Sequence, residues 1–355
     1  MKVNQCKSET QFKLDDETTT TDQKVISEKF NDFFINIGPN LAAKIPAQTV
    51  TPEHYLGIQT PTSLLLEPVT ATEFGDIIKS LKKCSPGHDE INKDVLDLSL
   101  PIIQTHLLYL VNQSLVQGIF PDELKVANIT PVFKANDSSK FNNYRPISVL
   151  SILSKIFEKA MYNRLIEFLE NLKILYEKQF GFRKKHSTYM ALMILIDKLI
   201  KCIENGEYVV GVFLDFSKAF DTVDHSILLR KLFHYGIRGT AYNWFESYLS
   251  NRKQCVSYNG VKSSMKPIKC GVPQGSILGP LLFLIYINDL INVCKKSSPY
   301  LFADDTNLFV NGNNLEDMVN SLNHELHDIS LWLKVNKLSL NIKKTHYMVF
   351  TSTGY

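Results

Sequence analysis

The chain has 355 residues, 44% of them hydrophobic, so it can bury a substantial core in one large or two ordinary domains. Lysine and arginine (39) exceed aspartate and glutamate (36) by too little to indicate nucleic-acid binding by themselves. The six cysteines lack zinc-type spacing and no secretory signal is visible, which predicts an intracellular protein with reduced thiols. The longest apolar stretch, residues 281–287, is far shorter than the roughly 20 residues that span a bilayer, so we expect no membrane partner.

Three kinds of segment are predicted before residue 67. Residues 1–25 are polar and predict a disordered tail, in which Asp15-Asp16 have too few apolar neighbours for a strand. Residues 25–46 repeat apolar positions at helical spacing and predict an amphipathic helix. Residues 47–66 are rich in threonine and proline, which is typical of a linker.

From Thr70 onward helices are expected to dominate, with a loop at Ser85–Asp89. A strand is predicted at Ile129–Phe133, and apolar spacing predicts helices over Ile147–Leu169 and Tyr189–Glu204. The elements predicted after residue 207 are a buried strand at 208–214, a helix at 226–233 capped by Asp224, a β-ribbon at 255–267, a glycine loop with a buried helix, a hairpin at 299–310 and a helix at 315–335.

Acidic residues occupy the tip of that hairpin and the end of the buried strand. Asp304 and Asp305 lie between apolar segments, and like charges about 4 Å apart repel by roughly 4 kcal/mol at an effective dielectric near 20. Asp215 ends the buried strand, where an acid is costly unless it is paired or binds a metal. An ordinary solvated turn is the alternative interpretation. If the strands share a sheet, Asp215 and Asp304 converge, and with the carbonyl of Phe216 they suit Mg²⁺. Asp221 and Asp224 are rival ligands to which we assign structural roles.

The order of segments 214–221, 271–280 and 302–305 resembles the palm of reverse transcriptases. The details are most similar to the non-LTR, LINE-type branch, near the jockey-like retrotransposons. Upstream, Asn143–Ser148 and Gln179–Arg183 are similar to the family's fingers motifs, and downstream Leu338–Thr345 is similar to its last palm motif. Each segment alone is compatible with chance, whereas six or more in family order are very specific.

The resemblance implies an α+β, right-hand polymerase-like fold. Residues 1–66 would form the tail, helix and linker, 67–207 a fingers-type region, and 208–355 a palm region built on a small antiparallel sheet backed by helices. The family continues past its last palm motif into a thumb, and no segment here resembles an endonuclease, so we expect both to be lost or separately encoded. The family usually carries glycine where this chain has Glu90.

The resemblance also implies the roles of individual residues. Asp215, Asp304 and, less directly, Asp305 would hold two Mg²⁺ ions together with Phe216, with Mn²⁺ as a substitute. Lys134 and Arg145 correspond to triphosphate-binding residues, and Phe220 to the aromatic that blocks a ribose 2′-OH. Gln274 and Gly275 would contact nucleotide or template, and Lys344 would be a general acid for pyrophosphate. For the isolated residues, the alternative interpretations are surface salt bridges, a core phenylalanine, a plain strand-to-helix turn and a solvated lysine.

Arg183, Lys184 and Lys185 follow two aromatic residues and predict contact with nucleic-acid phosphates, unless this is only a solvated basic loop. The expected function is RNA-directed DNA synthesis from an RNA template, a DNA primer and dNTPs. The alternative is a catalytically silent retroelement fragment or a co-opted nucleic-acid-binding protein. A maturase of the group II intron type fits the motif details less closely.

Overall fold

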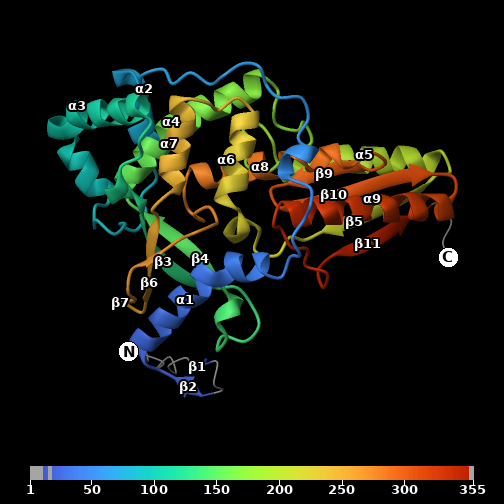
Figure 1. The fold of residues 1–355 in the computed structure, drawn as a ribbon, viewed down its shortest axis with the longest axis horizontal. Coiled ribbons are helices and arrows are strands. Elements are labelled where there is room, and N and C mark those ends of the chain that lie inside the picture. The colour runs from blue at the N-terminus through green and yellow to red at the C-terminus, as the bar shows by residue number, and fades with distance from the viewer. Residues whose placement is uncertain (1–10, 15–17, 352–355) are drawn as a thin grey trace, which may run out of the picture.

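Small β-sheets surrounded by helices give the described part of the chain an α+β fold, as expected (Figure 1). The structure is a computed structural model that describes residues 11–14 and 18–351. The helices that the paragraphs below do not bound individually are α2 (Ala71–Ser80), α7 (Thr240–Leu249) and the 3-10 helices η2 (Asp122–Lys125), η3 (Phe141–Asn143), η4 (Ala219–Thr222) and η5 (Asn288–Asn292).

One sheet is entirely antiparallel and has helices on both faces. Its strands, in spatial order, are β11 (His346–Phe350), β5 (Tyr208–Leu214), β10 (Asp305–Gly312) and β9 (Ser298–Phe302). Val209 and Phe213 of β5 pack with helix α5 (Thr188–Glu204), whereas Val210 and Val212 pack in the cluster that contains helix α9 (Leu315–Val335). Because strand side chains alternate between faces, α5 and α9 cover opposite sides of this sheet.

The second sheet joins strands that are distant in sequence. Its strands are β4 (Tyr144–Leu150), β3 (Val126–Phe133), β6 (Lys253–Tyr258) and β7 (Val261–Lys262), with β8 (Lys266–Pro267) also paired to β6. β3 pairs antiparallel with β4 and parallel with β6. The predicted ribbon around 255–267 therefore exists, and it extends a sheet that begins upstream of residue 208.

An N-terminal helix, α1 (Gln23–Ala42), covers this second sheet (Figure 1). Its Phe30 and Phe34 pack in one cluster with Tyr144 and Val256. Phe12 is fully buried in the same cluster, on the short strand β1 (Phe12–Lys13) that pairs with β2 (Thr19–Thr20). The expectation of a wholly disordered polar tail is therefore wrong at Phe12, because an aromatic cluster from distant segments buries it. Asp15-Asp16 lie outside the described residues.

Residues 47–66, predicted to be a linker, are hydrogen-bonded to the C-terminal end of helix α6 (His225–His234) and to the chain just after it. This segment contains the 3-10 helix η1 (Pro52–Tyr55), and Leu64 is buried. The backbone N–H of Thr60 donates to the carbonyl of His234 at 3.1 Å, and that of Leu64 donates to Gly236 at 2.9 Å. These bonds attach residues 60–64 to the main core.

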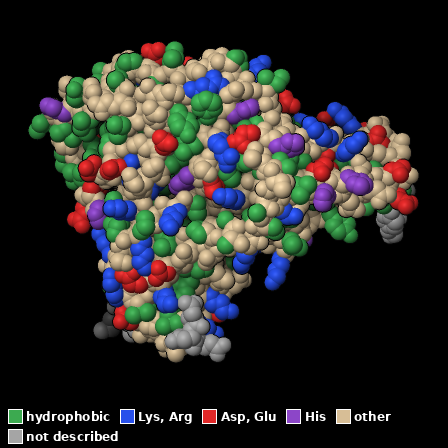
Figure 2. Space-filling view, viewed as in Figure 1, with side chains coloured by type: hydrophobic (Ala, Val, Ile, Leu, Met, Phe, Trp, Pro, Cys, Tyr) green, Lys and Arg blue, Asp and Glu red, His purple; other side chains and the backbone are tan. Residues whose placement is uncertain are grey.

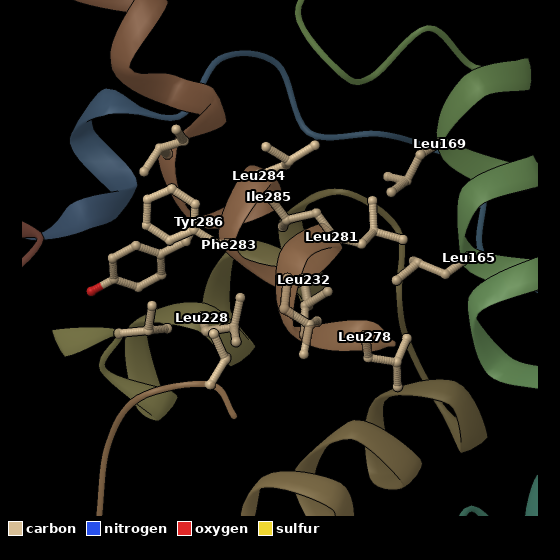
Figure 3. Close-up of a cluster of buried hydrophobic side chains, with 14 of the residues drawn as sticks. Leu165, Leu169, Leu228, Leu232, Leu278, Leu281, Phe283, Leu284, Ile285 and Tyr286 are labelled. Atoms are coloured by element: carbon tan, nitrogen blue, oxygen red, sulfur yellow. The ribbon is translucent and has the colours of Figure 1, made fainter. Parts of the chain in front are cut away.

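Helix α8 (Leu278–Ile287) lies at the centre of the largest hydrophobic cluster (Figure 3). It is apolar all round, and its side chains from Leu281 to Ile287 are at most 2% exposed, as a helix without a polar face requires. Figure 3 shows Leu278 and Leu281 beside Leu165 and Leu169 of helix α4 (Ile152–Asn171). The predicted burial of this segment is confirmed.

The predicted helix over Ile147–Leu169 is wrong at its start. Residues up to Leu150 belong to β4, and α4 begins at Ile152 with Ser151 as its N-cap. Alternate β4 residues, from Tyr144 to Leu150, are buried, which is the period of a strand packed on one face. Residues 147–150 continue the helical spacing of apolar residues, but their pairing with β3 makes them part of a strand, and the helix itself starts at residue 152. The helix predicted at 315–335 has the bounds of α9, and Asp224 caps α6 as expected.

Among the residues that the structure describes, one helix, α3 (Lys93–Gln117), is long and apolar enough to cross a membrane, by length and composition only. Its Val111 and Leu115 pack in the main core, whereas Leu98 and Ile102 are 82% and 80% exposed. In Figure 2, hydrophobic side chains gather at the end of the molecule that α3 occupies in Figure 1. The expectation that the chain has no membrane partner stays a prediction.

Glu90 occupies a backbone conformation that favours glycine. Its φ of 61° is in the left-handed region, and its N–H donates to the carbonyl of Gly87 at 3.3 Å. This conformation explains why the family usually carries glycine at the position of Glu90, because a Cβ in the left-handed region costs about 1–2 kcal/mol.

Replacing Glu90 with glycine is therefore expected to stabilise the fold by about 1 kcal/mol, the relief of the Cβ strain being partly offset by a more flexible unfolded chain. Urea unfolding measures this free energy. Glu90→Ala is the matched control, because it removes the charge and keeps the Cβ, and it should bring no gain. Equal stability of the two variants would contradict the left-handed assignment.

Candidate functional site

The pairing of β5, β9 and β10 brings the predicted acids together. Thr306 of β10 lies opposite Leu214 of β5, so the next residues, Asp305 and Asp215, lie at the same end of the two strands. β9 and β10 form the predicted hairpin, with Asp305 opposite Phe302 and a turn at Ala303 and Asp304. The expectation that the hairpin and the strand share one sheet is confirmed.

The electrostatics of the acids show that they are neighbours. Burial raises the pKa of Asp304, and repulsion by Asp305 and Asp215 raises it further. Burial and repulsion by Asp215 also raise the pKa of Asp305, while Lys344 opposes that shift. Among the described residues, no three His, Cys, Asp or Glu side chains are arranged as a metal-binding group. Mutually repelling carboxylates fit Mg²⁺, which takes one or two protein carboxylates and completes its shell with substrate oxygens and water.

Asp215 is held by the segment after α9. The side-chain amide of Asn341 donates to Asp215 Oδ2 at 2.8 Å, and the Asn341 N–H donates to the Asp215 carbonyl at 2.8 Å. An antiparallel bridge joins Phe216 to Leu340, and the Phe216 ring lies in the core. Sequence reasoning missed Asn341 as a partner of Asp215. The signal available was its place in the last palm motif.

Four cations form a group, and two of them, Arg145 and Lys344, act directly on the acids. Burial lowers the pKa of Lys134, and repulsion by Lys344, Arg145 and Lys218 lowers it further, so these charges are close together. Lys134 follows β3, and exposed Arg145 lies on β4, opposite Val132. Lys344 also lines a cavity of about 360 Å³ together with Asp215 and Asp305. Lys218 was not predicted as a site residue, because its position in a turn with φ of 51° shows only in the fold.

Phe220 lies at the edge of this region on η4. It stacks on Phe283 with ring centroids 4.5 Å apart and meets the edge of Phe182 at 6.0 Å. The ring is half-buried, so its position is fixed from behind while part of it stays accessible. The packing on Phe283 agrees with the core role, and the role of Phe220 as a steric gate stays a prediction.

Gln274 and Gly275 lie in the loop before α8. A Cβ on Gly275 would lie 2.3 Å from the carbonyl oxygen of Ser148, and its φ is 134°, so only glycine fits. The side-chain amide of Gln274 donates to Asp221 Oδ1 at 2.7 Å. Asp221 Oδ2 is buried without a partner in the described structure, and the structural role assigned to Asp221 stays a prediction.

The three basic residues predicted to bind nucleic acid differ in their surroundings. Arg183 makes a two-bond contact with Glu170, at 3.0 and 2.8 Å, and its side chain is 8% exposed. This geometry is a correction to the sequence-based role of Arg183, because the guanidinium is occupied within the protein. Lys184 and Lys185 are exposed, so both remain accessible to a phosphate backbone.

Acids gathered at a strand end and a hairpin tip, with a group of cations beside them, are typical of a phosphoryl-transfer site. The sequence model of the reverse transcriptase (RNA-dependent DNA polymerase) family matches residues 134–354. The chain therefore belongs to the reverse transcriptase family.

Its relatives include proteins of Drosophila melanogaster mobile elements. The probable RNA-directed DNA polymerase from transposon BS is 33% identical over 326 residues, which cover 86% of this chain and 35% of the relative. The RNA-directed DNA polymerase from mobile element jockey is 32% identical over 312 residues, 84% of this chain and 34% of the relative. A probable RNA-directed DNA polymerase from transposon X-element is 30% identical over 80% of this chain and 32% of the relative. The resemblance to the reverse transcriptase domain of a non-LTR, jockey-like retrotransposon is confirmed. The chain spans about a third of the length of these curated relatives.

The enclosed carboxyl group of Asp221 should make the stability of the fold depend on pH. Burial raises its pKa to about 6, against the Gln274 bond and the attraction of Lys218. The folded state then binds this proton more tightly than the unfolded chain, whose aspartates titrate near pH 3.9. The contribution of Asp221 to stability is therefore fully present below about pH 4 and is lost as the pH rises through about 6.

Asp221→Asn removes this titration and keeps an oxygen for Gln274. In urea unfolding, the loss of stability between pH 4.5 and pH 7.5 should shrink by about 2 kcal/mol in the variant. Asp197→Asn, on the exposed face of α5, is the control and should leave the pH dependence unchanged. Identical pH dependence in the wild type and Asp221→Asn would refute the assignment.

Proposed function

We propose that the chain catalyses RNA-directed DNA synthesis, the transfer of a deoxynucleotide from a dNTP to a DNA primer 3′-OH on an RNA template. The observation that carries this proposal is the adjacency of the acids Asp215, Asp304 and Asp305 to the cations Lys134, Arg145 and Lys344. Acids suit the metal-bound reacting oxygens, and cations suit the triphosphate. Membership of the family supports the same conclusion.

In this proposal the antiparallel sheet of β5, β9, β10 and β11 is a polymerase palm, and β3 and β4 belong to the fingers. Asp215, Asp304 and the carbonyl oxygen of Phe216 would hold two Mg²⁺ ions, with Asp305 contributing less directly and Mn²⁺ as a substitute. When bound, such ions neutralise charge on the attacking and leaving oxygens. Support comes from the raised pKa values of Asp304 and Asp305, because burial and then repulsion between the carboxylates disfavour their ionised forms, and a bound cation would offset both effects.

The remaining residues bind and select the nucleotide. Arg145 can bind phosphate oxygens through its planar fork, and Lys134 adds a point charge. Phe220, fixed by its stack on Phe283, excludes a ribose 2′-OH by contact. Lys344 is close to the acids and can give a proton to the pyrophosphate oxygen that leaves. Lys184 and Lys185 contact the backbone of the template and primer without reading sequence.

Removal of the carboxylate in Asp304→Ala is expected to reduce primer extension at least about 100-fold, the usual scale for losing a preorganised electrostatic group. The assay uses an RNA template, a DNA primer, dNTPs and Mg²⁺. Asp197→Ala, which removes an exposed acid of α5, is the control and should extend at the wild-type rate. Extension at the wild-type rate by Asp304→Ala rules out the metal assignment, and wild-type protein that binds template–primer without extending it supports the silent-fragment alternative.

Replacing Phe220 with alanine should raise the incorporation of ribonucleotides relative to deoxynucleotides by at least about 10-fold, because the ring that fills the space of a 2′-OH is gone. Single-nucleotide incorporation with dCTP and CTP gives the ratio of kcat/KM values. Phe220→Tyr keeps the ring and should keep the discrimination. If alanine and tyrosine discriminate equally, the steric gate lies at another residue.

A further inference from the structure

Gln179 bonds both polar backbone groups of the residue that precedes the acidic pair. Its Oε1 accepts from the N–H of Ala303 at 3.0 Å, and its Nε2 donates to the carbonyl of Ala303 at 3.4 Å. The same Oε1 accepts from the N–H of Gly181 at 2.9 Å. Gln179 is only 3% exposed, and Ala303 has a φ of 58°, a left-handed conformation that a residue with a Cβ adopts rarely. One buried amide thus holds an unfavourable turn in place.

The backbone around Gln179 is fastened to the same hairpin. The N–H of Phe180 donates to the carbonyl of Leu301 at 2.8 Å, and the N–H of Leu301 donates to Lys178 at 2.9 Å. These bonds form a parallel bridge between Gln179 and Leu301 at the outer edge of β9. A Cβ on Gly181 would lie 2.2 Å from the nitrogen of Ala303, so the segment leaves no room for a side chain there.

Arg183 anchors the segment from its other side. Besides the two bonds to Glu170 of α4, its Nη1 donates to the carbonyls of Tyr176, at 2.8 Å, and Gln179, at 3.4 Å. The guanidinium therefore fixes the backbone of Gln179 to a core helix. Gln179–Arg183 is the segment that resembles a fingers motif. Within it, the side chain of Gln179 bonds to the hairpin, and that of Arg183 bonds to the backbone of Gln179 and to Glu170.

We propose that Gln179 is a positioning residue that sets the direction of the Asp304 carboxylate by fixing the left-handed turn at Ala303. Asp304 follows Ala303 directly, so the φ and ψ angles of Ala303 decide where the next Cα–Cβ bond points. The side-chain amide of Gln179 supplies both the acceptor for the Ala303 N–H and the donor for its carbonyl, from two separate atoms. This inference rests on the proposed function, in which Asp304 is a metal ligand.

The test uses Mn²⁺ alone as the probe, followed by its free-ion electron paramagnetic resonance signal in the absence of template, primer and nucleotide. Binding that Asp304→Ala abolishes defines the site. Gln179→Met keeps the length and burial of the side chain and removes its two hydrogen bonds to Ala303. It should weaken this binding about 10-fold or more, as is usual when a group that orients a ligand is lost. Gln117→Met changes an exposed position of α3. It is the matched control and should bind Mn²⁺ as the wild type does.

A rescue separates positioning from packing. Glycine adopts a positive φ without strain, so Ala303→Gly combined with Gln179→Met should recover part of the lost affinity. If Gln179 served only to fill space, the glycine would recover none, and the proposal would be wrong. Gln179→Glu, which keeps the shape and loses the donor, is measured in place of the methionine variant if the latter does not retain a cooperative thermal unfolding transition.

The two proposals fail in different ways. Asp304-dependent Mn²⁺ binding that is unchanged in folded Gln179 variants overturns the positioning role and leaves the polymerase function standing. Gln179-dependent Mn²⁺ binding in a chain that extends no primer overturns the function and leaves the positioning role standing.

Discussion

β5 and β10 pair along their whole facing length, from Tyr208 opposite Gly312 to Leu214 opposite Thr306, and this register decides where the acids lie. Val210 and Val212 face the core that contains α8 and α9, whereas Val209 and Phe213 face α5. A slip of one residue would turn each set toward the wrong helix. The apolar side chains thus fix the register, and the register carries Asp215 to the end of the strand beside Asp305.

The site combines two kinds of unfavourable charge. Burial and mutual repulsion raise the pKa values of Asp304 and Asp305, while burial and repulsion by like charges lower the pKa of Lys134. Each group of like charges is stabilised by a ligand of opposite sign. In the proposed function, a metal-bound polyphosphate would bring cations to the acids and anions to the lysines and arginine, so that one ligand would relieve the repulsion in both groups. The protein holds these charges in advance because rigid strands and turns, rather than long flexible segments, carry them.

Sequence patterns located those parts of the site that depend on local chemistry. Hairpin composition gave the turn at Asp304, and apolar spacing gave the bounds of α9. Predictions from sequence patterns failed where contact with a residue distant in sequence determines the local structure. The part of β4 from Ile147 onward was assigned to a helix because its pairing with β3 is invisible in a local window. Phe12 was left in a tail because three of its aromatic neighbours, Phe141, Tyr144 and Tyr258, lie more than a hundred residues away. Arg183 was predicted to bind nucleic-acid phosphates, because no residue near it in the sequence indicates that Glu170 is its partner.

Helix α1 lies against η4 and against the loop that precedes α8. A Cβ on Gly38 would lie 2.3 Å from the sulfur of Cys270 and 2.7 Å from the carbonyl oxygen of Asp221, so the helix is in close contact with both segments. The family match begins only at residue 134. A fragment trimmed to that boundary would lose α1 and expose to water the apolar surfaces of Tyr144 and Val256 that pack in one cluster with it. The segment upstream of the family match is therefore part of the packed structure, because α1 shares a hydrophobic cluster with residues inside the match.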